Sequence, residues 1–264
     1  MTSTSPAADP SATAGPLAGR TALVTGAASG IGRAVATRLA EQGASLLLLD
    51  VNEAGAREAA EQVGGEALTA DLSDRTAIEA LGLGERGIDV LVNNAGIQHV
   101  APIEDFDPER FELIHRIMLQ APFHLTRAVL PGMYAAGWGR IVHLSSVHGH
   151  RASAYKSAYV SAKHGLEGLS KVIALEGAAK GVTSNTVCPG YVRTPLVEGQ
   201  VADQARSHGI AEDEVLEQVL LARTPVKRLV EPEEVAHLVG FLCGPGTDSI
   251  NGQSYLMDGG WTAQ

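Results

Sequence analysis

Two side chains that could move a proton lie four residues apart in the second half of the chain. Tyr159 and Lys163 fall in a segment with a helical pattern, so they should share one face of the helix. A tyrosine transfers protons poorly at neutral pH because its reference pKa is about 10, but a nearby ammonium favours the phenolate and lowers that pKa. Ser146, which follows the apolar segment 140–144, can donate a hydrogen bond to a substrate oxygen beside the phenol. These residues predict acid–base chemistry, with a solvated helix face as the alternative.

A glycine-rich turn near the start of the chain predicts a dinucleotide-binding site. The apolar segment 21–25 leads into Gly26-Ala-Ala-Ser-Gly30-Ile-Gly32, and an amphipathic helical pattern follows over residues 33–42. A second apolar strand, residues 44–49, ends in Asp50. In this order of strand, turn, helix and strand, glycines let the backbone approach a pyrophosphate at the helix N-terminus, where free N–H groups favour anions.

The acid at the end of the second strand predicts which dinucleotide is bound. Asp50 could accept hydrogen bonds from the adenosine ribose hydroxyls, and it would repel a 2′-phosphate there. The residues that follow it, Val51, Asn52 and Glu53, supply no arginine to hold such a phosphate. The sequence therefore predicts NAD rather than NADP.

Further apolar and amphipathic segments continue the alternation of strand and helix. Strands are predicted over residues 66–70, 88–92, 140–144, 182–187 and 253–257. Helices are predicted over residues 53–63, 75–83, 107–125, 231–242 and from Tyr159 to about residue 180. Pro122 should bend or break the helix in which it lies. No internal repeat or linker divides the chain.

Two short motifs lie at strand ends where a cofactor could pass. Asp71 and Leu72 could hydrogen-bond and pack against an adenine ring, although Asp71 could equally cap the next helix. The small residues of Asn93-Asn94-Ala95-Gly96 would let a cofactor cross the backbone while an asparagine braces neighbouring strands, and a plain structural turn is the alternative.

Composition and length indicate one globular domain. The 264 residues, 45% of them hydrophobic, suffice for a sizeable core at residues 18–264, whereas residues 1–17 are predicted to be a disordered tail. The formal charge of −10 argues against nucleic acid or an anionic membrane as a partner. Two cysteines cannot form a disulfide framework, and neither a membrane helix nor a signal peptide is evident. We expect a cytoplasmic protein, and no metal site is predicted.

A polar segment late in the chain has the composition of a lid. Residues 194–224 are polar and partly helical, which suits a mobile cover over an active site. Its apolar anchors are expected to be Val201, Ile210, Val215, Val219 and Leu220.

Taken together, the motifs resemble the short-chain dehydrogenase/reductase family from about Gly19 to the end of the chain. The family's order is reproduced by the glycine turn, Asn93–Gly96, Ser146, Tyr159-x-x-x-Lys163 and Pro189-Gly190. The resemblance implies an α/β fold, a doubly wound Rossmann-type parallel sheet of about seven strands in a single domain, assembled as a homotetramer. It also implies that Tyr159 is the general base, that Lys163 lowers its pKa and holds the nicotinamide ribose, and that Ser146 positions the substrate oxygen. The cofactor-binding residues implied are Gly26, Ser29, Gly30, Ile31, Gly32, Asp50, Asp71, Leu72, Asn93, Ala95, Gly96, Tyr159, Lys163, Pro189, Gly190, Val192 and Thr194.

A narrower resemblance is to the bacterial D-3-hydroxybutyrate dehydrogenases. It rests on Asn93–Gln98, His148-Gly149, Lys156–Tyr159 and the segment from Pro189 to Gln200. It implies that a substrate carboxylate is held by Gln98, His148, Lys156 and Gln200. Tyr191 stands where these relatives usually carry tryptophan, which keeps an aromatic wall but changes the pocket width. The expected reaction is the interconversion of D-3-hydroxybutyrate and acetoacetate, a step of ketone-body metabolism.

One position departs from the family pattern. The helix asparagine that usually helps to relay the proton aligns with Met118, whose thioether has no hydrogen to donate, and Gln120 is the only amide nearby. Two alternatives to the expected reaction follow. One is a dehydrogenase or reductase for another small hydroxy acid or a 3-oxoacyl thioester, and the other is a cofactor-sensing protein of the same fold with little turnover.

Overall fold

The computed structural model describes residues 15–263, so the predicted disordered tail at residues 1–17 lies mostly outside the described part of the chain. The prediction that the disordered tail extends to Leu17 is wrong. Leu17 is 1% exposed, packs into the core and donates its backbone N–H to the carbonyl of Gln42. The ordered domain therefore includes residues 15–17.

The core of the fold is one parallel sheet of seven strands in the order β3-β2-β1-β4-β5-β6-β7, which confirms the predicted doubly wound architecture. The strands are β1 (Thr21–Thr25), β2 (Ser45–Asp50), β3 (Glu66–Thr69), β4 (Val90–Asn93), β5 (Gly139–Leu144), β6 (Val182–Pro189) and β7 (Ser254–Met257). Runs such as the four leucines of β2 read as continuous apolar segments because helices cover both faces of a parallel sheet.

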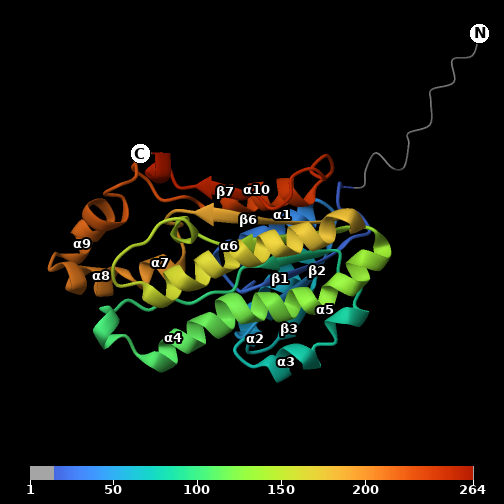
Figure 1. Cartoon of the computed structure of the whole chain (residues 1–264), viewed down its shortest axis with the longest axis horizontal. Coiled ribbons are helices and arrows are strands. Elements are labelled where there is room, and N and C mark those ends of the chain that lie inside the picture. The colour runs from blue at the N-terminus through green and yellow to red at the C-terminus, as the bar shows by residue number, and fades with distance from the viewer. Residues whose placement is uncertain (1–14, 264) are drawn as a thin grey trace, which may run out of the picture.

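Helices form the two outer layers. They are α1 (Gly30–Glu41), α2 (Glu53–Val63), α3 (Arg75–Ala80), α4 (Pro108–His115), α5 (Ala121–Ala136), α6 (Ser157–Gly177) and α10 (Pro232–Cys243). Figure 1 shows α5 and α6 side by side across one face of the sheet, with α1 and α10 behind it. Alternate strand residues serve the two layers, because Val24 packs in the cluster that includes α1 and α10, whereas Leu23 packs with α5.

The predicted helix 107–125 is interrupted and longer than expected. A π-helical turn over Arg116–Gln120 separates α4 from α5, and α5 continues to Ala136. Pro122 lies two residues after the end of this turn and has no N–H to donate to the carbonyl four residues earlier, at Met118. The wider turn lets the helix absorb the proline without ending, as single π turns often do near functional sites.

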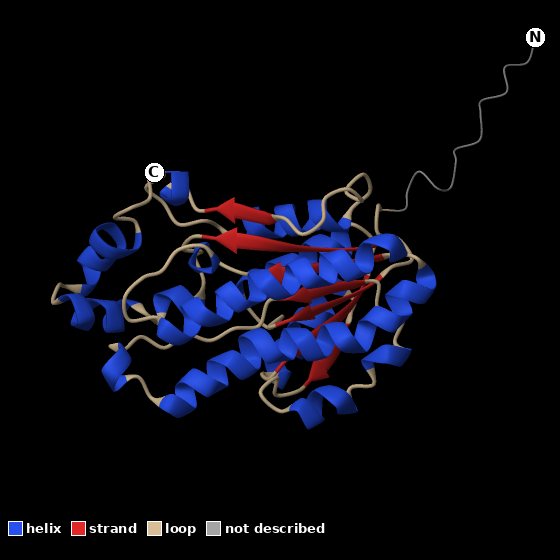
Figure 2. Cartoon of the chain, viewed as in Figure 1, coloured by secondary structure: helices blue, strands red, loops and turns tan. Residues whose placement is uncertain are grey.

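The segment predicted as a lid folds into short helices with a core of its own. They are α7 (Pro195–Glu198), α8 (Val201–His208), α9 (Glu212–Val215) and a π-helical turn (Leu216–Leu220). The five predicted anchors all belong to one cluster with Val197, Ala205 and Tyr191. In Figure 2 the arrowheads of β6 and β7 point toward the end of the molecule where Figure 1 places α7, α8 and α9, so these helices lie beyond the carboxyl ends of the strands.

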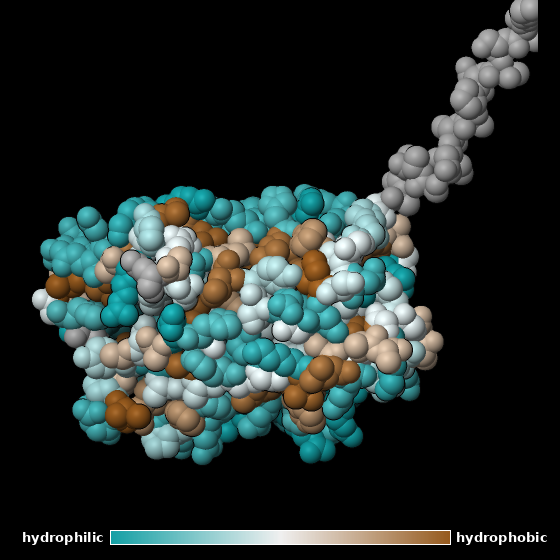
Figure 3. Space-filling model, turned by 45° about the horizontal axis from the view of Figure 1, so that its top comes forward, coloured by the Kyte–Doolittle hydropathy of each residue, from teal (hydrophilic) through white to brown (hydrophobic). Residues whose placement is uncertain are grey.

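Two further observations concern the helices and the surface of residues 15–263. None of these helices is both long and apolar enough to cross a bilayer. Figure 3 shows a face with separate hydrophobic patches between broader hydrophilic areas.

Candidate active site

A cavity of about 320 Å³ opens at the carboxyl ends of the central strands, where the strand order reverses between β1 and β4. Open α/β sheets place their ligands at this point. Of the residues predicted to bind the cofactor, its wall contains Gly26, Ser29, Gly30, Ile31, Asp50, Asp71, Leu72, Ala95, Gly96, Tyr159, Lys163, Pro189 and Thr194.

The other four predicted cofactor residues do not line this cavity. Gly32 packs against the carbonyl of Gly26, and Asn93 is buried with its amide directed to His143. Val192 is buried and pairs with Val230, while Gly190 lines a second, smaller cavity. Asn94, which the sequence analysis did not select, does line the larger cavity.

The glycine turn is built for close backbone approach. Gly26 and Gly30 have φ of +64° and +53°, the left-handed region that glycine enters without strain. A Cβ on Gly32 would lie 2.1 Å from the carbonyl oxygen of Gly26. No side chain caps the first turn of α1, whose N-cap is Ser29, so this helix end can receive an anion.

Asparagine side chains fix the turn to the neighbouring strand. The amide of Asn94 donates to the carbonyls of Thr25 and Gly26, at 2.9 and 3.2 Å. The hydroxyl of Thr25 accepts from the backbone N–H groups of Asn94 and Ala95. The predicted bracing of the strands therefore comes from Asn94. The preceding residue, Asn93, is buried and directs its amide to His143.

The two acids predicted to bind the adenosine half lie at one end of the cavity. Asp50 accepts from the backbone N–H groups of Ala28 and Asn52, at 3.0 and 2.9 Å, which fixes its carboxylate beside the glycine turn. Asp71 accepts from the N–H of Ser73, but α3 is capped by Asp74 instead, so the alternative role of Asp71 as the helix cap is wrong.

A second cavity of about 50 Å³ brings together every residue predicted to hold the substrate. Its wall contains Gln98, Ser146, His148, Lys156, Tyr159, Gly190, Tyr191, Leu196, Val197 and Gln200. Tyr159 lines both cavities, so the smaller one adjoins the larger. The segments from β4, β5, α6, β6 and α7 thus converge on the phenol, although they are far apart in the sequence.

The predicted acid–base residues Tyr159 and Lys163 lie close together, and burial has the largest influence on the pKa of each. Lys163 is 4% exposed, donates to the carbonyl of Leu144 at 2.5 Å and lies 5.4 Å from the centre of the Tyr159 ring. Burial lowers the pKa of Lys163 to about 8, against the raising influence of Cys188 and Glu167. Burial raises the pKa of Tyr159 to about 12, and a hydrogen bond with Ser146 offsets only part of this. The prediction that Lys163 brings the pKa of Tyr159 toward neutrality is therefore wrong for the free protein.

The cation predicted to anchor a carboxylate is buried. Lys156 stands at the N-cap of α6 with only 3% of its surface exposed. Its ammonium donates to the hydroxyl of Tyr191 at 3.1 Å and lies 4.9 Å from the centre of that ring. Burial lowers the pKa of Lys156 to about 8, so the group is still charged at neutral pH.

The remaining polar groups of the small cavity are partly occupied. Both ring nitrogens of His148 face hydroxyl groups, with Nδ1 3.3 Å from Ser146 and Nε2 2.9 Å from Ser153. Burial lowers the pKa of His148 to about 3, so the ring is neutral. Gln200 donates its amide to the carbonyl of Leu196, while its side-chain oxygen is buried without a hydrogen-bond partner.

Sequence reasoning missed two residues beside the site. Trp261 stacks on Tyr191 with ring centres 6.4 Å apart and meets His148 edge-on at 5.6 Å. Tyr155, next to Lys156, has φ of +69° although it is not glycine. The aromatic identity of Trp261 was the only available signal for it, and the backbone conformation of Tyr155 has none in the sequence.

Met118 lies at the cavity, as the alignment with the family's relay asparagine predicts. It is 1% exposed, lines the larger cavity and packs with Phe106 and Ile114. Gln120 is exposed and does not line the cavity, so it cannot take the place of the missing amide.

Known proteins resemble this chain over nearly its whole length. A family model described as "Enoyl-(Acyl carrier protein) reductase" matches residues 26–262. The chain is 46% identical over 257 residues to the D-beta-hydroxybutyrate dehydrogenase of Cupriavidus necator, which covers 94% of this chain and 100% of that protein. It is 44% identical over 261 residues to the protein of the same name from Rhizobium meliloti, covering 93% of this chain and 99% of that protein.

Solved structures resemble it equally broadly. A crystal structure of a putative NAD(P)-dependent gluconate 5-dehydrogenase from Beutenbergia cavernae, with NADP bound at low occupancy, matches with a TM-score of 0.85 at 36% identity. The match covers 95% of this chain and 100% of that one.

Proposed function

This chain belongs to the short-chain dehydrogenase/reductase family, and from that membership we propose that it is an NAD-dependent dehydrogenase that interconverts D-3-hydroxybutyrate and acetoacetate. The observation that carries the proposal is the buried cation Lys156 in the small cavity beside Tyr159. The names of the two bacterial relatives agree with it.

A buried ammonium in this position calls for an anion. Burying a charge is costly unless it is paired, and the described wall of the small cavity contains neither Asp nor Glu. Tyr191 gives Lys156 a hydroxyl and a ring face but no negative charge. A substrate carboxylate would supply the missing charge and place the reacting carbon near Tyr159.

The size of the cavity favours a short acid. A space of about 50 Å³ between Tyr191, His148 and Leu196 admits few heavy atoms beyond the carboxylate. A thioester substrate would leave Lys156 without a counter-charge, and a sugar acid would need more room. Other small hydroxy acids remain the second candidate class.

The residues of the larger cavity fit a dinucleotide. The glycine turn at the start of α1 would hold the pyrophosphate, and Asp50 would accept from the adenosine ribose hydroxyls. NAD held by these residues would supply the hydride acceptor for the substrate carbon. Tyr159 would take the hydroxyl proton, Ser146 would hold the substrate oxygen, and Lys163 would stabilise the phenolate. Because Met118 cannot relay a proton, we propose that the proton leaves Tyr159 by way of the nicotinamide ribose hydroxyl, Lys163 and solvent.

The preference for NAD needs its own test, because the similar gluconate 5-dehydrogenase structure holds NADP. The end of the cavity that contains Asp50, Asp71 and Leu72 has no arginine or lysine in its described wall. We expect catalytic efficiency to be at least tenfold higher with NAD, about 1.4 kcal/mol in the barrier. Asp50→Ala should shrink this gap, because repulsion of the 2′-phosphate is lost, and equal efficiency with both cofactors in the wild type would contradict the assignment.

The decisive experiment for the function is NADH formation by the purified protein with NAD and a panel of substrates. The panel contains D- and L-3-hydroxybutyrate, other short hydroxy acids, gluconate and a 3-hydroxybutyryl thioester. We expect the D-acid to give the highest kcat/KM. A preference for the thioester would transfer the proposal to that class, and NAD binding without turnover of any compound would favour the cofactor-sensing alternative.

Assembly, mobility and location complete the proposal. Exposed apolar side chains on α6 and α10, including Leu175 at 81% and Phe241 at 53% exposure, would be covered in the homotetramer that the family resemblance implies. Light scattering would measure the mass of the assembly.

We further propose that residues 194–224 act as a mobile lid and that the protein works in the cytoplasm.

A further inference from the structure

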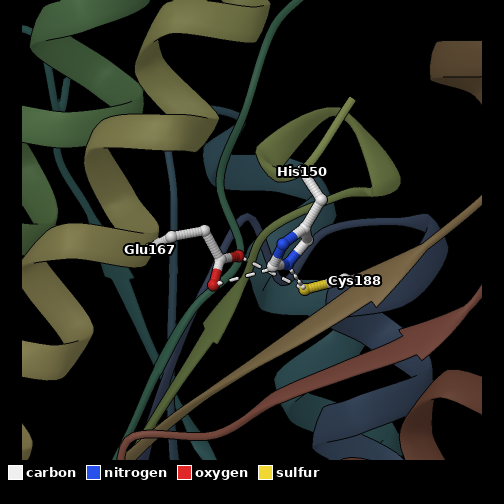
Figure 4. Close-up of side chains that lie close together, drawn as sticks. All are labelled: His150, Glu167 and Cys188. Carbon is white, nitrogen blue, oxygen red and sulfur yellow. Dashed lines mark hydrogen bonds and ion pairs between the residues drawn. The ribbon is translucent and has the colours of Figure 1, made fainter. Parts of the chain in front are cut away.

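Three potential metal ligands converge beneath the active site, outside the two cavities. Figure 4 shows the side chains of His150, Glu167 and Cys188 directed toward one another. They come from distant parts of the chain, since His150 follows the turn Val147–Gly149, Glu167 lies on α6 and Cys188 on β6. Their nitrogen, carboxylate oxygen and sulfur atoms all lie within 4.8 Å of one another.

The separations suit a tetrahedral ion. The Cys188 sulfur is 3.2 Å from Oε1 of Glu167 and 3.6 Å from Nε2 of His150, and this nitrogen is 3.7 Å from Oε2 of Glu167. Zinc bonds of about 2.3 Å to sulfur and about 2.0–2.1 Å to nitrogen and oxygen place tetrahedral ligands roughly 3.3–3.6 Å apart. The sulfur–nitrogen separation already matches this spacing, and each of these two atoms has one oxygen of the Glu167 carboxylate at a similar distance, so a small rotation of the carboxylate would bring a single oxygen into place.

The surroundings hold the carboxylate in place. Oε2 of Glu167 accepts from the hydroxyls of Thr186 and Ser254, at 2.8 and 2.6 Å. Such supporting hydrogen bonds orient metal ligands and raise affinity. The hydroxyl of Ser145 is buried without a hydrogen bond of good geometry, and a Cβ on Gly149 would lie within 3.0 Å of both this oxygen and Glu167 Oε1. Ser145 therefore faces the same small space and could hydrogen-bond to a water on the ion.

We propose that His150, Glu167 and Cys188 bind one zinc ion. Binding replaces the thiol proton, which is released to solvent as the sulfur–zinc bond forms, and the thiolate, the carboxylate and Zn²⁺ sum to zero charge. Thiolate and imidazole ligands favour zinc over magnesium or calcium. The His150 side chain, 32% exposed, gives the ion an entry path and leaves the fourth position to water.

The ion would tie three segments together just behind the catalytic residues. Glu167 lies one helical turn after Lys163, and Cys188 directly precedes Pro189-Gly190 at the end of β6. The site does not depend on the proposed dehydrogenase activity, because none of its ligands lines either cavity. In the metal-free protein the Cys188 thiol is protonated and donates a hydrogen bond to Glu167. Burial and the charge of Glu167 raise the pKa of this thiol to about 12.

The test is metal binding by the full-length, untagged protein after treatment with a chelator. Titration with Co²⁺ as a spectroscopic probe should produce one equivalent of a sulfur-to-cobalt charge-transfer band, and Zn²⁺ should displace it. Cys188→Ser should remove the band and weaken zinc binding at least about a hundredfold. Cys243→Ser, at the second buried cysteine, is the matched control and should bind as the wild type does.

Two results would overturn the proposal. One is a wild-type protein that shows neither the cobalt band nor calorimetric binding of micromolar zinc. The other is a Cys188→Ser protein, folded by circular dichroism, that binds zinc as tightly as the wild type. His150→Ala changes only a partly exposed side chain and provides a second variant that should also lose binding. Because the readout is metal and not turnover, the outcome is separate from that of the substrate panel.

Discussion

At the scale of single residues, burial decides the chemistry of the two lysines. Lys156 and Lys163 have the same ordinary pKa, and burial lowers the pKa of both to about 8. They differ in their partners, because Lys163 donates to a backbone carbonyl whereas Lys156 meets only a phenol. Lys156 is thus the cation that a substrate anion can pair with.

This assignment predicts a pH-dependent KM. Lys156 is protonated below about pH 8 and loses its charge above it, so KM for a carboxylate substrate should rise as pH passes through 8. Lys156→Met should cost roughly 2–4 kcal/mol of transition-state binding and make KM insensitive to pH in this range. Initial rates from pH 6.5 to 9.5 test both, with Tyr191→Phe as the variant that keeps the cation. A Lys156→Met enzyme with the wild-type KM profile would place the anchor elsewhere.

Substitution of Met118 by asparagine should have a small effect on catalysis and a larger effect on stability. If the enzyme works without the amide relay, Met118→Asn should change kcat by less than about tenfold, whereas Tyr159→Phe should lower it by about 10²–10⁴-fold with NAD binding retained. The asparagine would also lie among Phe106, Ile114 and Ala158, where an unpaired amide costs about 1–3 kcal/mol. Turnover and thermal unfolding of both variants are the measurements. Activity that appears only in Met118→Asn would refute the relay-free mechanism.

At the scale of elements, the junction of β1 and α1 is limited by backbone contact. A Cβ on Gly32 would lie 2.1 Å from the carbonyl oxygen of Gly26, and a backbone atom cannot rotate away. Gly32→Ala should therefore shift α1 against β1, weaken NAD binding at least tenfold and lower the melting temperature.

Gly168 on α6 provides the matched control for this substitution. A Cβ there has no atom within 4 Å outside its own helix, so Gly168→Ala should keep NAD affinity and stabilise α6 by about 0.5–1 kcal/mol. Fluorescence titration with NAD and calorimetric unfolding would measure both variants. Equal NAD affinity in the Gly32→Ala and wild-type proteins would show that this contact is not needed for the cofactor.

At the scale of the whole molecule, buried neutral histidines predict acid sensitivity. Burial lowers the pKa of His143 and His148 to about 3. The unfolded chain binds protons at these residues near pH 6.5 and the folded chain does not, so stability should fall as pH falls from about 6.5 toward 3. Glu167, with its pKa below the ordinary value, adds to this only below about pH 4.5.

Thermal unfolding at pH 7.5, 6.5, 5.5 and 4.8 separates these contributions. The melting temperature should fall steadily below pH 6.5, and His143→Asn should flatten that decline while keeping an acceptor for the Asn93 amide. A melting temperature that is constant from pH 7.5 to 4.8 in the wild type would contradict the prediction.

The sequence by itself determined the doubly wound sheet and most of the predicted residues that line the two cavities. Glycine spacing, apolar runs and the interval from Tyr159 to Lys163 are local features, and local features can be recognised directly in the amino-acid sequence. Val201, Ile210 and Val215 were identified as apolar residues within the polar segment 194–224, and in the structure they pack into one cluster.

Only the tertiary structure decided the properties that depend on which atoms surround a residue, such as side-chain pKa values and hydrogen-bond partners. The structure reversed the expected direction of the Tyr159 pKa shift. It showed a π-helical turn before Pro122 where a bend or a break was predicted, and it assigned the bracing role to Asn94. It also brought His150, Glu167 and Cys188 together from three elements. Desolvation and side-chain convergence arise from contacts between segments far apart in the chain, so no spacing within the sequence could report them.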